Sequence, residues 1–525
     1  MTLEFRYERV EGWPSLAWLA RCGRGDSTIE VRHGWRVETR PGWFGGIIWA
    51  GPFAEADFDR TDVVFGSGGR VRDGAIVFVS PATTVSRLHS FEAHEAVWVS
   101  NSLPCLMAAL EAGLDPTYPR YMFDFRTIAT AGLADYKRTL ATSAGPIRFT
   151  YFHNLRWDGE RLAVQEKPVP VRDFTSYSKY FRFMDESVAG LAENMSDPAR
   201  AHTYRMYGTM STGYDSPAVC ALARPHGLRE AVAFTEARGG VPDSGKEIGE
   251  YLDVKVVERS TDAWKGIPLA EVPFLAGDAS GGEAYFAEAE ELLAGTALVS
   301  GVMGGWTWAM RTRHPGPNFQ AGMMHGTSLC EFVLWAGSIH APIAFLGGRQ
   351  RDELIALSNT PEMVPWDLGV KYSRPIPRRI LEEAGVPRNL FGMEKKFGAI
   401  RLADPETFRT SAMADEFQTW LRANSGAWLR KGRVPPHILS RMTGLVKWPA
   451  YLLSRALISI RDESPMRWKR TRWIYLVGHR EFLCRYHFPW AIEKAKERYR
   501  GAAAAHPPRT ETGRPTGASA RAPAS

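Results

Sequence analysis

A short polar turn between an apolar segment and a helical one has residue types suited to binding phosphate. The turn consists of Ser211, Thr212, Gly213, Tyr214, Asp215 and Ser216. Small residues after a buried strand let backbone amides point into one concavity, and the following helix start adds its positive dipole end. Ser211 and Ser216 add hydroxyl donors, while Asp215 beside a phosphate is explained by a bridging magnesium ion. These residues predict a phosphate site, and the alternative is an ordinary turn in which Asp215 caps the helix.

A second stretch, from Gly240 to Lys246, has the spacing of a Walker A phosphate loop. It follows the apolar segment 230–235 and precedes a helical pattern, as that motif requires. Glu247, however, stands where Ser or Thr would bind magnesium, and its carboxylate would repel phosphates. We therefore interpret this stretch as a chance match that forms the loop before the second helix.

Composition restricts the class of protein. The chain has 525 residues, of which 44% are hydrophobic and 23% charged, and this indicates a globular protein with at least two domains. Its five cysteines are scattered without the spacing of a metal site, so we expect a reduced, cytoplasmic protein. No apolar run approaches the roughly 20 residues that cross a bilayer, so no membrane span is expected.

The net charge of +7 is unevenly distributed, because the segment 467–473 and the end of the chain carry much of it. Such a patch could meet nucleic acid, anionic lipid or an acidic peptide. A solvated helix face and a basic tail are the commoner origin of this pattern. A nucleic-acid partner is therefore not expected.

Sequence patterns divide the chain into parts. Residues 1–167 contain short alternating runs broken by Gly, Pro and Asn, which indicates a mainly β domain, and the prolines of 168–174 mark a linker. Continuous apolar strands alternate with helices over 175–400, as is typical of a parallel sheet. Helical patterns fill 401–500, whereas 501–525 lacks large apolar residues and is expected to be disordered.

The order of several segments resembles the asparagine synthetase family. That family opens its synthetase domain with Ser-Gly-Gly-x-Asp-Ser after a first strand, and the turn at 211–216 is similar to it. Further similar segments are the strand end Phe234-Thr235, the apolar stretch 296–305, the helical segment 371–392, the EKKFGAI motif at 394–400 and, more weakly, 99–114. The turn is the most specific part of a resemblance that spans about residues 40–400.

The resemblance implies an α/β fold in successive domains. We expect a degenerate glutaminase-like α+β domain of the Ntn-hydrolase type at 1–167, followed by a parallel-sheet ATP-pyrophosphatase domain at 175–400. A helical extension of the synthetase domain is expected at 401–500.

It also implies a set of site residues for ATP and Mg²⁺. Those expected to hold the nucleotide are Ser211, Thr212, Gly213, Asp215, Ser216 and Thr235. Asp215 would be the magnesium ligand, and Thr235 with its neighbouring backbone would contact adenine or ribose, as the switch point of an open sheet predicts. Lys396, or Lys395 one residue earlier, would be the catalytic cation that stabilises charge in the second half-reaction.

The implied activity is that of an ATP-dependent ligase. In the family, a substrate carboxylate attacks the α-phosphate of ATP, pyrophosphate leaves, and an amine displaces AMP to form an amide. The substrates would be a small-molecule or peptide carboxylate and an amine. The sequence identifies neither of them, and it leaves open whether the protein forms a homodimer.

The chain departs from the family at two places. Thr2 stands where glutamine-using members have a nucleophilic cysteine, so no glutaminase activity is expected, and in this respect the chain resembles β-lactam synthetases and lasso-peptide cyclases. Gly305 and Trp306 replace an Asp-Glu pair that helps to hold magnesium and pyrophosphate. Acids that could substitute for this pair are Asp278, Glu283, Asp352 and Glu353. The alternative function is that of a catalytically silent nucleotide-binding or scaffold homologue in a biosynthetic pathway.

Overall fold

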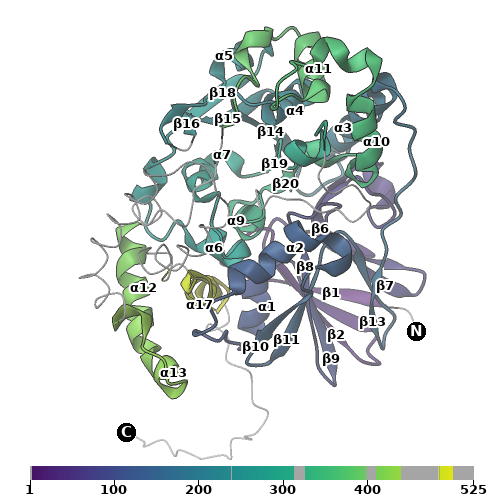
Figure 1. Ribbon diagram of the computed structural model, residues 1–525. Helices are drawn as coiled ribbons and strands as arrows, with labels where there is room; N and C mark the ends of the chain where they lie inside the picture. The colour runs from purple at the N-terminus through teal and green to yellow at the C-terminus, as the bar shows by residue number, and fades with distance from the viewer. Residues whose placement is uncertain are drawn as a thin grey trace, which may run out of the picture.

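The computed structural model of the chain is a mixed α/β structure in which different parts contain antiparallel and parallel sheets (Figure 1). The residues that it describes are 3–237, 239–311, 326–396, 398, 410–438, 483 and 485–500. Thr2, the basic segment 467–473 and the predicted disordered tail 501–525 lie outside them. The architecture confirms the prediction of an α/β chain that contains a parallel sheet.

The amino-terminal region contains two sheets, whose strands pair antiparallel except for β1 with β3. The first has the order β1-β3-β2-β9-β8-β11-β10, with strands β1 (Glu4–Arg9), β2 (Trp18–Gly23), β3 (Thr28–His33), β8 (Leu88–Glu92), β9 (Ala96–Ser100), β10 (Thr139–Thr142) and β11 (Gly145–Thr150). The second has the order β13-β12-β7-β6-β5-β4, with strands β4 (Glu38–Arg40), β5 (Trp43–Trp49), β6 (Val64–Arg72), β7 (Ala75–Val79), β12 (Asn154–Trp157) and β13 (Leu162–Gln165).

Alternating side chains explain how these two sheets pack. Trp18 from the first sheet and Phe44 and Phe78 from the second share one buried core, and the Trp18 and Phe44 ring centres lie 5.1 Å apart. On the other face of the first sheet, Phe125 of α2 (Tyr121–Asp135) stacks on Phe149 of β11 at 5.4 Å. The nearby helix α1 (Leu103–Ala109) begins at its Ser102 cap. Successive side chains of a strand point to opposite faces, so the first sheet contributes apolar side chains to a core on each of its faces.

The second region is built on a five-stranded parallel sheet of order β18-β15-β14-β19-β20. Its strands are β14 (Arg205–Met210), β15 (Glu230–Phe234), β18 (Lys255–Arg259), β19 (Thr296–Val299) and β20 (Ile339–Ala341). A short hairpin of β16 (Glu236–Ala237) and β17 (Val241–Pro242) follows β15. The linker 168–174 enters this region without a helix or strand.

Helices cover both faces of the parallel sheet. Met206 and Ala231 belong to one core, with α3 (Tyr177–Ser196), α4 (Asp215–Ala223) and α11 (Pro375–Glu383). Tyr207 and Val232, one residue further along each strand, belong to the opposite core, with α6 (Val272–Asp278) and α9 (Leu329–Ala336). Other helices of this region are α5 (Lys246–Tyr251), α7 (Glu290–Leu293), α8 (Gly304–Thr307) and α10 (Arg351–Ser358). Burial on both faces accounts for the continuous apolar runs of these strands.

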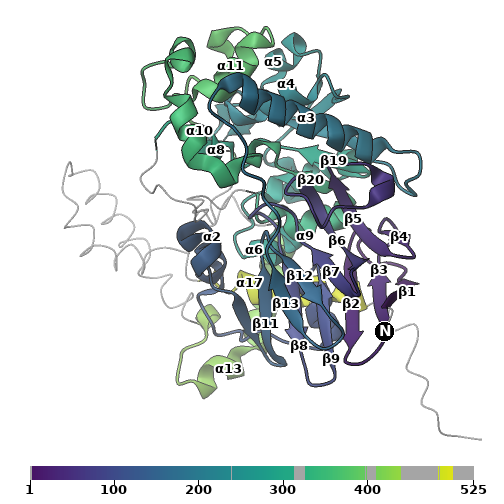
Figure 2. The same cartoon turned by 90° about the vertical axis from the view of Figure 1, so that its right-hand side faces the viewer.

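The described part of the carboxy-terminal region is helical, as predicted, with α12 (Ser411–Ala423), α13 (Ser425–Arg430) and α17 (His487–Arg500). Helix α17 lies beside both α1 and α6, and Figure 2 shows it in yellow behind the amino-terminal strands. Its Tyr499 hydroxyl donates to buried Glu331 of α9 at 2.6 Å, and its Tyr499 carbonyl accepts from the Trp13 indole at 3.1 Å. This helix therefore links the two regions. Among the described helices, none combines the length and apolar character needed to cross a bilayer.

Candidate functional site

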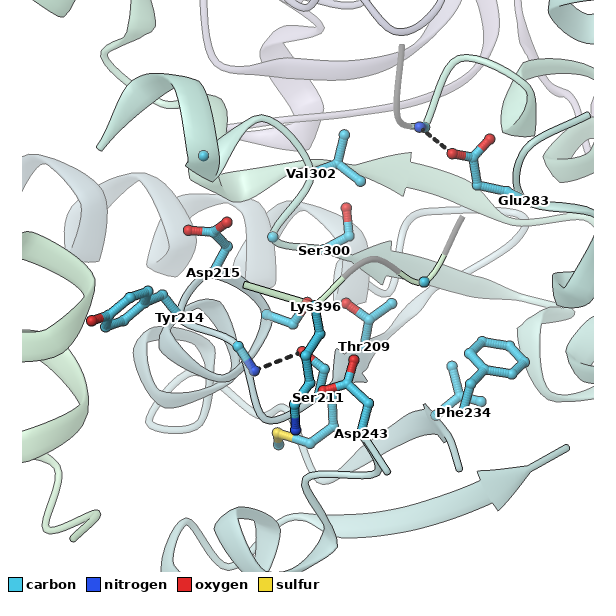
Figure 3. Close-up of a pocket in the computed structure, with 18 of the residues that line it drawn as sticks. Thr209, Ser211, Tyr214, Asp215, Phe234, Asp243, Glu283, Ser300, Val302 and Lys396 are labelled. Atoms are coloured by element: carbon cyan, nitrogen blue, oxygen red, sulfur yellow. Dashed lines mark hydrogen bonds between the residues drawn. The ribbon is translucent and has the colours of Figure 1, made fainter. Parts of the chain in front are cut away.

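A cleft lies at the carboxyl edge of the parallel sheet, beside the ends of β14 and β19 (Figure 3). The chain leaves β14 toward β15 on one side and later places β19 on the other side, so the strand order reverses here. Loops on either side of such a reversal separate, and open α/β sheets bind ligands in the resulting crevice. The predicted residues that line the cleft are Ser211, Gly213, Asp215, Ser216, Lys395 and Lys396. The fold thus brings the polar turn and the distant lysine pair together.

Hydrogen bonds within the protein fix the shape of the turn. The Gly213 amide donates to Ser211 Oγ at 3.2 Å. The amide and the hydroxyl of Thr212 both donate to Asp243 Oδ1, at 3.0 and 2.6 Å, and its carbonyl accepts from the Gly392 amide at 2.9 Å. Thr212 is not among the residues that line the cleft. Two amides expected to bind phosphate therefore already have partners, and Thr212 anchors the turn.

Donors for an anion are concentrated at the start of α4. The N-cap residue Tyr214 gives no side-chain hydrogen bond to the first turn, and Pro217 has no amide hydrogen. The amides of Asp215 and Ser216 are the donors that a helix start leaves for a ligand. Because Ser216 also lines the cleft, its hydroxyl can act with them.

No packing contact within the described residues requires glycine, as opposed to a larger residue, at position 213. A Cβ atom at this position would meet only Ser211 Oγ, at the ordinary contact distance of 3.4 Å. Glycine at a lining position keeps space beside the backbone, as close approach of a ligand requires.

Both predicted lysines lie at the cleft, and Lys396 reaches the turn. Its Nζ donates to Thr212 Oγ1 and to the Pro242 carbonyl, both at 2.8 Å. Lys395 lines the cleft with its Nζ 5.7 Å from the ring centre of Tyr372. Phe397, the next residue of the motif, lies outside the described residues. The geometry favours Lys396 as the lysine that acts with the turn.

The Walker-like stretch forms the loop before α5, in agreement with its interpretation from the sequence. The Lys246 Nζ lies 3.6 Å from a carboxylate oxygen of Glu258, and Glu247 occupies the first turn of α5. Gly245 packs on the turn, because a Cβ atom there would lie 2.6 Å from the Ser211 carbonyl oxygen. This loop therefore supports the predicted phosphate turn from outside.

An apolar wall forms another side of the cleft. Phe234 at the end of β15 lines it, and its ring centre lies 4.4 Å from that of Tyr285 in an edge-to-face contact. Thr235 is exposed and is not among the lining residues; its amide donates to the Arg259 carbonyl, and its carbonyl accepts from the Asp243 amide. At the end of β15, Phe234 and not Thr235 is therefore the side chain that faces the cleft.

Asp215 is held by an arginine that the sequence interpretation did not single out. Arg374 Nη1 donates to both carboxylate oxygens of Asp215, at 2.9 and 2.8 Å. The side chains are 12% and 17% exposed, so the pair is largely shielded from water. Burial alone would lower the pKa of Arg374, but the Asp215 carboxylate outweighs it and the pKa is raised. The carboxylate that was expected to bind magnesium thus accepts hydrogen bonds from a guanidinium group.

The described residues do not fit a magnesium ion held by Asp215. Among them, no group of three or more His, Cys, Asp or Glu side chains is placed to hold a metal. Glu283 lines the cleft, but it accepts hydrogen bonds from the Gly326 amide, at 2.9 Å, and from the Ser328 hydroxyl. Asp352 and Glu353 are exposed on the first turn of α10. The acids considered as substitutes are therefore engaged elsewhere or lie away from the cleft.

Asp278, the remaining substitute, has no exposed surface and lies behind Glu283. Burial and the charge of Glu283 raise the pKa of Asp278 to about 6, although hydrogen bonds from Thr327 and Ser280 oppose the shift. The folded-state pKa is above the unfolded value of 3.8, so Asp278 stabilises the fold when protonated and loses this effect as the pH rises through 6. Its protonation should therefore make stability depend on pH in the acidic range.

Asp278→Asn removes this titration. Relative to the wild type, the variant should gain about 2 kcal/mol in unfolding free energy between about pH 4 and pH 7. Denaturant unfolding of both proteins at several pH values measures the difference, and Asp253→Asn, at an exposed aspartate, is the control. A difference that does not change with pH would contradict the assigned shift.

Two residues of this site were missed from the sequence. Arg374 precedes Pro375 at the start of α11, where Arg378 and Arg379 have acids one helical turn away for local pairing. That pairing is observed, with Glu382 at 3.1 Å and Glu383 at 2.7 Å, respectively. Asp243 lies in the Walker-like loop. The sequence signal for it was Thr212, which stands where the asparagine synthetase motif has glycine and whose hydroxyl needs a hydrogen-bond acceptor.

A comparison with protein-family models finds no match for the chain, and a comparison with curated proteins finds none either.

Proposed function

We propose that the protein is an asparagine synthetase-like ligase that uses ATP to adenylate a carboxylate and then forms an amide. The observation that carries this proposal is the turn 211–216 and the start of α4 at the point where the strand order reverses, with Lys396 bonded to that turn. Anion donors, a positive charge and an apolar wall face one cleft. This combination suits a nucleotide better than a purely apolar or purely anionic ligand.

In this proposal, each wall of the cleft binds one part of ATP. Phe234 and Tyr285 contact the base, and the space at Gly213 lets the phosphates approach the backbone. The Asp215 and Ser216 amides donate to phosphate oxygens as charge develops. Lys396, already oriented by two acceptors at 2.8 Å, stabilises negative charge on the reacting groups. Positioning and charge stabilisation are the main contributions that such a reaction needs.

We further propose that the parallel-sheet region is an ATP-pyrophosphatase-type domain and that the two amino-terminal sheets are a degenerate Ntn-hydrolase-type domain. The nitrogen would then come from a substrate amine. The strand order supports the first assignment, and the two packed sheets of the amino-terminal region support the second.

The test is the fate of labelled ATP. The purified protein, incubated with pools of carboxylic acids and amines, should release AMP and pyrophosphate over many turnovers only when both substrate classes are present. Gly213→Val should abolish release because its side chain fills the cleft, and Gly266→Val is the control, since a Cβ atom there meets nothing within 4 Å. Release of ADP and phosphate, or equal activity in Gly213→Val, would reject the proposal.

A catalytically silent nucleotide-binding homologue is the second candidate. The observation that favours it is the pairing of Asp215 with Arg374, together with Gly305 and Trp306 where the family has an Asp-Glu pair. ATP binding without AMP release under all substrate combinations would support this candidate. Substrate-dependent AMP release would exclude it.

A further inference from the structure

The charges at the start of α4 are arranged differently from those of a metal site. Arg374, at the N-cap of α11, places one guanidinium nitrogen within hydrogen-bond distance of both oxygens of Asp215. Magnesium demands near-octahedral oxygen ligands at about 2.0–2.1 Å, so at this carboxylate it would compete with a guanidinium group that already neutralises the charge. The pair is largely buried, and breaking it would leave a charge without its partner.

Two consecutive glycines of α8 enclose the ion pair. A Cβ atom at Gly304 would lie 2.8 Å from the Asp215 carboxylate carbon, and one at Gly305 would lie 3.0 Å from Arg374 Nη2. Any side chain at these positions would therefore press on the pair. Gly305 stands where the resembling family carries an acid, and with its neighbour Gly304 it provides space here for Asp215 and Arg374 to remain together.

Positive side chains from two segments meet at this end of the cleft. Lys395 and Lys396 line it, and Arg374 contacts its lining residues Asp215 and Tyr372, with the guanidinium carbon 5.4 Å from the Tyr372 ring centre. The Asp215 charge, which would repel phosphate when unpaired, is compensated by Arg374. Fixed cations can neutralise phosphate in the way that a bound divalent ion does, and arginine is well suited to this because its charge persists on burial.

We propose that the site binds the polyphosphate of a nucleotide without a magnesium ion coordinated by Asp215, and that Arg374 supplies the compensating charge. This inference rests on the nucleotide site of the proposed function, but not on amide formation. It makes Arg374, which contacts the lining residue Asp215 without lining the cleft itself, the residue that compensates the Asp215 charge beside the phosphates.

The experiment is a calorimetric titration of the full-length protein with ATP, in excess magnesium chloride and in excess EDTA. Wild-type affinity should differ by less than about threefold between the two buffers, because the charges that bind phosphate belong to the protein. Arg374→Ala should weaken binding in EDTA by about tenfold or more, because the charge of Asp215 is then uncompensated beside the phosphates. Magnesium should partly restore it, since Asp215 is then available to a metal.

Asp215→Asn and Lys371→Ala complete the design. Asp215→Asn removes the carboxylate charge and should bind ATP in EDTA at least as well as the wild type. Lys371→Ala removes an exposed cation three residues from Arg374 and should leave affinity unchanged in both buffers. Circular dichroism spectra confirm that each variant is folded.

Two results would overturn the inference and can be told apart. Wild-type binding that is lost in EDTA, combined with loss of magnesium-dependent binding in Asp215→Asn, would identify Asp215 as a metal ligand and leave the proposed ligase function standing. No ATP binding in either buffer would reject the nucleotide site, and with it the proposed function.

Discussion

Alanine at Gly301 is expected to abolish ATP binding and to lower the unfolding free energy by about 2 kcal/mol, the usual range for an overpacked site. Gly301 lies just after β19, where a Cβ atom would be 2.4 Å from both the Asp215 carbonyl carbon and the Ser216 amide nitrogen. These are backbone atoms of the first turn of α4, so no side-chain rotation relieves the overlap. The helix start must move away from the cleft, and the amides that we propose bind the phosphates move with it.

Titration calorimetry measures the affinity of Gly301→Ala for ATP, and denaturant unfolding measures its stability. Gly266→Ala is the matched control, because the added Cβ atom has no neighbour within 4 Å. The control should bind ATP as the wild type does. Normal ATP affinity in a folded Gly301→Ala protein would show that the start of α4 is not part of the nucleotide site.

Alanine at Lys396 is expected to lower kcat for amide formation by about 100-fold or more, as loss of one group that stabilises a developing charge commonly does. The Lys396 Nζ bridges Thr212 Oγ1 and the Pro242 carbonyl, so it joins the phosphate turn to the loop that supports it. Its removal takes away a positive charge at the cleft and one anchor of Thr212. KM for ATP should rise less than kcat falls, because the amides of α4 remain.

Steady-state rates of AMP release provide this measurement once a substrate pair is known. Lys371→Ala, which removes an exposed lysine that does not line the cleft, should keep wild-type kcat. Lys396→Arg should retain part of the activity, since it keeps the charge with a different geometry. A fall in kcat for Lys395→Ala that exceeds the fall for Lys396→Ala would reverse the assignment of the two lysines.

Sequence reasoning located the elements that carry the site because each had a strong local signal. The apolar run before Ser211 became β14, and the next two apolar runs became β15 and β19. Continuous apolar strands separated by helices leave few arrangements besides a parallel sheet, and the carboxyl ends of its strands then share one edge. This reasoning places the polar turn at that edge, whereas only the family resemblance placed the lysine pair with it. The fold brings the two together although they are far apart in the chain.

Partners of individual side chains could not be predicted in the same way. Asp215 was interpreted as a metal ligand, but a carboxylate at a helix start pairs equally well with a guanidinium group. Only the fold brings Arg374 to it. Thr235 and its neighbouring backbone were expected to contact adenine or ribose, whereas the alternation of side chains along β15 directs Phe234 into the cleft. Helix α17 had a clear helical pattern, but its position between α1 and α6 depends on contacts remote in sequence.

Hydrogen–deuterium exchange with and without ATP tests the central claim, that the turn after β14 and the start of α4 form a nucleotide site. We predict that ATP slows exchange in peptides covering 209–219 and 298–305, which border the cleft. Protection confined to the Walker-like loop 240–246, or to peptides of the amino-terminal sheets, would contradict it.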